Sequence, residues 1–187
     1  MQLQGIRIEY FINGGVALIW AYPLLKIFAK ISEFLEFPKL TEFHFIVLIP
    51  LCYVAGMFVA FLAKALFKRK RNKIRKEMFS SHFTDKKIKQ IKILIKAAKY
   101  NKEVYDLLEV NLTRQRITRG NLINLIITIL VVPSYLVFVK NGAWWNVAFS
   151  FLLLLALLLL NWKMWVSQQK IYYDYLCETY KFIQKRN

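Results

Sequence analysis

The sequence has little of what most catalytic and metal sites require. It contains two histidines, two cysteines and eleven acidic residues in 187 positions. A structural zinc site takes four closely spaced cysteine or histidine ligands, and His44 and His82 lie far apart. No phosphate-binding loop, HExxH motif, nucleophile elbow or dinucleotide fingerprint occurs. We therefore expect a protein that is not an enzyme and that binds no metal and no cofactor.

Disulfides are not expected either. Cys52 lies inside an apolar run and Cys177 in a charged tail, so the topology predicted below places the two thiols in different compartments.

The sequence is rich in hydrophobic residues and in basic residues. Hydrophobic residues make up 57% of the chain, while 28 Lys and Arg against 11 Asp and Glu give a formal net charge of +17. A disordered chain would lack the apolar content, and a small soluble domain could not bury so much of it. The two excesses occupy separate segments, which predicts a membrane protein with basic regions outside the bilayer.

Four apolar runs are long enough to cross a bilayer as helices, which takes roughly 20 residues for a hydrocarbon core of about 30 Å. They cover approximately 10–28, 43–66, 122–139 and 143–165. Barrel strands would alternate in polarity, and these runs do not. The predicted fold is an all-α integral membrane protein with four transmembrane helices.

The runs divide the chain into four parts. Residues 1–66 form an N-terminal transmembrane hairpin, 67–120 a basic helical hairpin, 121–165 a second transmembrane hairpin and 166–187 a helical tail. The stretch from Lys64 to Gly120 holds 18 basic and 5 acidic residues. Because basic segments stay on the cytoplasmic side, we expect this stretch, the tail and both termini to be cytoplasmic.

The basic residues between the second and third spans are candidates for contact with anionic lipid or with a partner. The segment 64–81 is expected to continue the second span as a helix, and each basic residue next to an anionic leaflet contributes about 1 kcal/mol. Nucleic acid would need the same charges, but nothing singles it out. The candidate contact residues are Lys68, Arg69, Lys70, Arg71, Arg75, Lys86, Lys89, Lys92, Lys96, Arg114 and Arg116.

Two amphipathic helices are predicted within the basic segment. The first follows an N-cap at Thr84 and Asp85, and the second covers 102–118, with Gly120 as its C-terminal cap. Their apolar stripes either pack on each other and on the tail, which we favour, or lie on the bilayer or a partner.

The tail is expected to continue the fourth span as one helix, because it contains no proline or glycine. Its aromatic and aliphatic stripe either packs against the 102–118 helix or contacts a neighbouring subunit. The residues assigned to this contact are Tyr172, Leu176, Tyr180 and Ile183.

Polar residues at membrane depth are the remaining functional candidates. Asn13, Gly14 and Gly15 lie in the first span, with Glu9 one turn before Asn13. Small residues allow helices to approach closely, which favours a tight helix contact. Repeated around an oligomer axis, Glu9 and Asn13 would instead form polar rings that line a pore.

The layout resembles small bacterial membrane proteins encoded in anti-phage and bacteriocin systems. A short, basic, four-span chain with a cytoplasmic helical segment between spans two and three is most similar to the membrane subunit of the Kiwa defence system. Phage exclusion membrane proteins and pore-type colicin immunity proteins share the general plan. The resemblance implies an inner-membrane homo-oligomer, by analogy a tetramer, and it transfers no functional residue.

Three functions follow as hypotheses. The first, which we favour, is an oligomeric sensor, effector or scaffold that recruits a soluble cytoplasmic partner to the membrane in a defence system. The second is a pore or ion channel, and the third is an immunity protein against a pore-forming bacteriocin.

Overall fold

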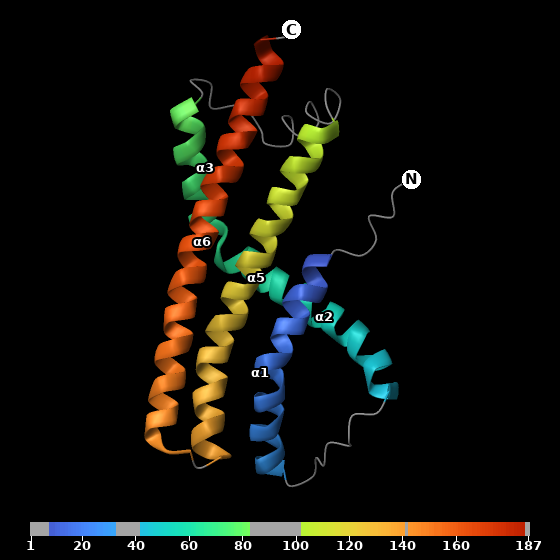
Figure 1. Cartoon of the computed structure of the whole chain (residues 1–187), viewed down its shortest axis with the longest axis vertical. Helices are drawn as coiled ribbons and strands as arrows, with labels where there is room; N and C mark the ends of the chain where they lie inside the picture. Colours follow the sequence, from blue (N-terminus) through green and yellow to red (C-terminus); the bar gives the residue numbers. More distant parts are fainter. Residues whose placement is uncertain (1–7, 33–41, 83–101, 141, 186–187) are drawn as a thin grey trace.

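The computed structural model of the chain describes residues 8–32, 42–82, 102–140 and 142–185 (Figure 1). Every regular element within these ranges is an α-helix, which confirms the predicted all-α class. The helices are α1 (Ile8–Ser32), α2 (Glu42–Leu66), α3 (Lys68–His82), α5 (Lys102–Phe138) and α6 (Trp144–Lys185).

Four of these helices are long and apolar enough to cross a membrane. Helices α1, α2, α5 and α6 are each at least 18 residues long and contain an 18-residue apolar window with no more than two charged residues. Each of these helices overlaps one of the four predicted runs, so the chain is a multi-pass membrane protein built from helices.

Helix α5 is the central element. It contacts α6 on one side and α1 and α2 on the other. Figure 1 shows α1, α5 and α6 side by side along the long axis, while α2 runs obliquely across them. The first two spans therefore form a crossing pair rather than two parallel rods.

The predicted end of a helix at Gly120 is wrong. Helix α5 is continuous through Gly120, so the basic segment and the third span share one element of 37 residues. Gly120 is buried, and a Cβ there would overlap the side chain of Asn13 in α1. The glycine serves a helix contact instead of a cap.

The chain changes direction at Phe67, between α2 and α3. The segment after Lys64 is helical as predicted, but Figure 1 shows α3 turning to run along α6. The backbone amide of Phe67 still donates to the oxygen of Ala63 at 3.1 Å. The Phe67 ring packs against Trp162 and Trp165, with centroids 5.9 and 5.2 Å apart, which fixes the bend on α6.

The end of the molecule that carries α3, residues 102–120 of α5 and residues 166–185 of α6 is called the basic end. Its core joins the three helices through Ile74, Leu108 and Leu176, among other buried side chains. The predicted packing of the tail against the 102–118 helix is thus confirmed.

The assignment of the tail stripe to a subunit contact is corrected. Its residues are held inside one chain, where they cover the apolar sides of α3 and α5. Tyr172, Leu176 and Ile183 are buried and Tyr180 is packed against the same core.

Candidate functional site

The first span meets the second at two glycines. A Cβ on Gly14 would overlap the backbone oxygen of Cys52, and a Cβ on Gly56 would overlap that of Tyr10. Gly15, by contrast, has nothing within 4 Å of the position of its missing Cβ. Gly14 therefore makes the tight helix contact predicted for this group, and Gly15 takes no part in it.

Asn13 lies at the junction of α1 and α5. It is fully buried, and its backbone oxygen accepts a hydrogen bond of 2.8 Å from the side-chain amide of Asn124. The Asn124 side-chain oxygen accepts a second bond, of 3.1 Å, from the indole of Trp20. These bonds lock α1 to α5 at membrane depth.

Glu9 forms an ion pair with Arg116. An oxygen of the Glu9 carboxylate lies 3.0 Å from Nη1 of Arg116, and Glu9 is only 3% exposed. Both Glu9 and Asn13 therefore face the interior of a single chain. Because both residues are buried among the helices of one chain, this placement favours the tight helix contact over polar rings around an oligomer axis.

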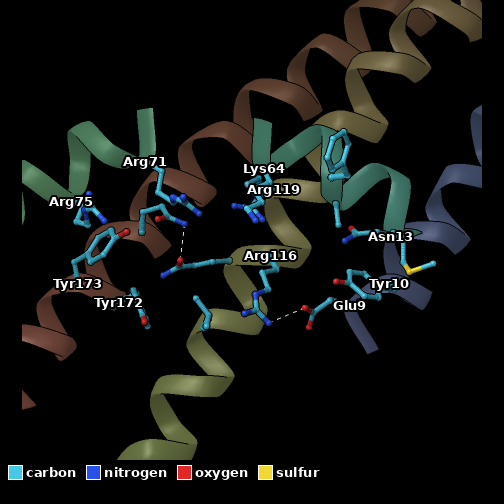
Figure 2. Close-up of a pocket in the computed structure, with 16 residues that line it drawn as sticks. Glu9, Tyr10, Asn13, Lys64, Arg71, Arg75, Arg116, Arg119, Tyr172 and Tyr173 are labelled. Atoms are coloured by element: carbon cyan, nitrogen blue, oxygen red, sulfur yellow. Dashed lines mark hydrogen bonds and ion pairs between the residues drawn. The ribbon is translucent and has the colours of Figure 1, made fainter. Parts of the chain in front are cut away.

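Glu9 belongs to a cavity of about 490 Å³ where all five described helices meet, here called the cationic cavity (Figure 2). Among the described residues, its charged lining consists of five cations and this one carboxylate. The cations are Lys64 of α2, Arg71 and Arg75 of α3, and Arg116 and Arg119 of α5. Tyr172, Tyr173 and Gln169 contribute the α6 side.

The cations of the cavity repel one another, which disfavours their charged forms. Arg119 lies three residues before the third apolar run, and burial lowers its pKa to about 10, with further lowering by Arg71 and Arg116. The Nε atom of Arg119 is buried without a hydrogen-bond partner among the described residues. Burial also raises the pKa of the Tyr173 phenol, although Arg71, Arg75 and Arg119 oppose that shift.

Two glutamines that line the cavity, Gln115 of α5 and Gln169 of α6, connect these helices by a hydrogen bond. Gln169 donates to Gln115 at 2.8 Å, and Gln115 donates to the backbone oxygen of Gln168 at 3.3 Å. Both paired side chains are buried. Sequence reasoning missed these two residues, as well as Lys64, Arg119 and Tyr173, because only the folded packing brings them together.

The structure sorts the predicted basic residues into two sets. Arg71, Arg75 and Arg116 line the cationic cavity. Lys68, Arg69, Lys70 and Arg114 are exposed away from it. The candidates Lys86, Lys89, Lys92 and Lys96 lie outside the described residues.

No protein-family model matches the chain, no curated protein matches its sequence, and no solved structure matches its fold. A cavity rich in guanidinium groups, with phenol and amide donors beside them, is suited to holding an anion.

Proposed function

We propose that the chain is a non-enzymatic scaffold subunit in the bacterial inner membrane, which holds an acidic soluble protein at the cytoplasmic face within a defence system. The observation that supports the proposal most directly is the orientation of α3. Its apolar side packs on α6 through Ile74, Met78 and Phe79, so the opposite, basic side is directed outward.

The outward side of α3 carries cations with almost no acidic neighbours. Lys68, Arg69, Lys70, Lys73 and Lys76 are exposed. Glu77 is the single acidic residue of α3, and its carboxylate lies 4.0 Å from the ammonium of Lys73. A rigid helix with this charge attracts a negatively charged surface and orients it during encounter.

The position of this helix suits a recruitment role. It directly follows a span, and the excess of basic residues in this region favours the cytoplasmic side. A partner held by α3 would therefore be kept close to the inner face of the membrane. The homo-oligomer and the tetramer remain predictions from the resemblance to defence membrane proteins. The burial of Glu9 and Asn13 weakens the case for the pore alternative. No contact among the described residues favours an immunity protein.

The test compares two matched neutralisations. Arg69→Gln with Lys70→Gln removes two exposed charges from α3, while Lys163→Gln with Lys170→Gln removes two exposed charges from α6. Each version is purified from cells that also express the neighbouring genes, and the co-purifying soluble protein is identified. Its affinity is then measured against the chain in nanodiscs of neutral phosphatidylcholine.

We expect the α3 pair to weaken binding of an acidic partner by about tenfold or more, the α6 pair to leave binding nearly unchanged, and salt to weaken binding to the unmodified chain. Equal loss in both pairs, or binding that salt does not affect, would contradict a docking role for α3.

A further inference from the structure

We propose that the cationic cavity binds a phosphate group, carried either by an anionic phospholipid or by a soluble phosphate compound. This site is separate from the outward side of α3 and goes beyond the scaffold function.

The charges of the cavity favour an anionic ligand. Among the described residues that line it, five cations face one carboxylate, and Glu9 pairs with Arg116 at 3.0 Å. Within the part of the chain that the structure describes, none of the other four cations lies within ion-pair distance of a carboxylate. Figure 2 shows Arg71, Lys64 and Arg119 around the same space, with Arg75 beside Tyr173. A phosphate placed there would supply the missing negative charge.

The hydrogen-bond donors of the cavity also favour a phosphate. Guanidinium groups bind phosphate oxygens through two parallel N–H bonds, and the cavity has three arginines without a carboxylate partner among the described residues. The buried Nε of Arg119 has a proton with no acceptor in the described part of the chain. The Tyr173 phenol is directed toward Arg71 and Arg75 in Figure 2, where it can donate to a bound oxygen.

The fold forces these cations together. Arg71 and Arg75 are carried by α3, which the apolar core of the basic end holds against α6. Arg116 and Arg119 are carried by α5, which the same core holds in place. Mutual repulsion among the cations therefore opposes this packing, and an anion bound between α3 and α5 would relieve it.

The lining of the cationic cavity is charged on one part and apolar on another. Lys64 lies near the end of the second apolar run, and Arg119 lies three residues before the third. Met57 and Phe61 of α2 line the same cavity. A phospholipid would place its phosphate among the arginines and its glycerol and acyl chains toward α2, whereas a soluble phosphate compound would use the charges alone.

The experiment uses the full chain, purified in a neutral detergent and stripped of lipid. Binding is followed by native mass spectrometry and by the thermal unfolding midpoint from tryptophan fluorescence. The probes are dioleoylphosphatidylglycerol, dioleoylphosphatidylcholine and inorganic pyrophosphate, with sodium chloride added to equalise ionic strength. The cavity variant is Arg71→Gln with Arg75→Gln, and the matched control is Lys163→Gln with Lys170→Gln, two exposed cations of α6 that do not line the cavity.

We expect phosphatidylglycerol, pyrophosphate or both to bind and raise the unfolding midpoint, with a loss of about tenfold in affinity in the cavity variant and little change in the control. Response to phosphatidylglycerol alone identifies the lipid as the source of the phosphate, and response to pyrophosphate identifies a soluble compound. Equal binding of phosphatidylcholine and phosphatidylglycerol without response to pyrophosphate, or equal losses in cavity variant and control, would overturn the proposal.

A second variant keeps the test decisive if Arg71→Gln with Arg75→Gln fails to fold. Glu9→Gln removes the one carboxylate among the described residues that line the cavity, so phosphate binding should become tighter while most other changes would weaken it. Weaker or unchanged binding in this variant would count against a phosphate site.

Discussion

Gly14 and Gly15 are adjacent in α1, but their missing Cβ atoms would have different surroundings. The Cβ position of Gly14 falls on the backbone of α2, so the helices can cross here only without a side chain. Gly15 is exposed and has open space around its Cβ position. Alanine should therefore lower the stability of the chain at Gly14 but not at Gly15.

We expect Gly14→Ala to destabilise the chain by about 1–3 kcal/mol or more, because α1 and α2 must separate to admit the methyl group. Gly15→Ala should be neutral or should stabilise it by up to about 1 kcal/mol, through the higher helix propensity of alanine. Thermal unfolding in detergent measures both. Similar effects at the two positions would show that the helices do not cross at Gly14.

The sequence marks Glu9 and Asn13 as unusual, because polar residues near or within a span are costly and need partners. It does not show which partners they have. Arg116 is 107 positions from Glu9, and Asn124 is 111 from Asn13, so no local spacing relates them. The partners lie in α5 of the same chain, which favours the helix-contact interpretation of Glu9 and Asn13 over the pore hypothesis.

At the scale of elements, helix type was predictable and helix ends were not. The lengths of the apolar runs were enough to predict four spans, and the lack of proline and glycine in the tail predicted the continuity of α6. Glycine often follows a helix end, so the local sequence predicts a cap at Gly120. Helix α5 continues through it because Asn13 of another helix occupies the space, which is information that the local sequence does not contain.

The tail segment of α6 provides the prediction at this scale. Leu176 is fully buried between α3 and α5, while Ile171, less than two turns earlier, is 48% exposed. We expect Leu176→Ala to cost about 2–5 kcal/mol of stability, since it leaves a cavity in the core of the basic end. Ile171→Ala removes a similar aliphatic group and should change stability by about 0.5 kcal/mol or less.

Detergent unfolding of the two variants, together with limited proteolysis of α3, measures this difference. The Leu176 variant should release α3 for cleavage, whereas the Ile171 variant should not. Equal stability would mean that the tail does not hold the basic end together.

At the scale of the whole molecule, charge and hydrophobicity are separated along the long axis. Helices α5 and α6 extend about 55 and 63 Å at 1.5 Å per residue, roughly twice the thickness of the hydrocarbon core. Half of each helix is therefore free to project from the bilayer. Figure 1 shows these halves and α3 at the same end, so a single polarity of insertion places all the basic helices in one compartment.

The last prediction concerns this polarity. In a Cys52→Ala, Cys177→Ala background, single cysteines replace Lys70 of α3, Glu178 of α6 and Lys140 between α5 and α6. Because basic segments stay inside, a membrane-impermeant maleimide should label Lys140→Cys in intact cells. It should label Lys70→Cys and Glu178→Cys only after permeabilisation. Labelling of Lys70→Cys and Glu178→Cys in intact cells would place the basic end outside, where α3 could not recruit a cytoplasmic protein.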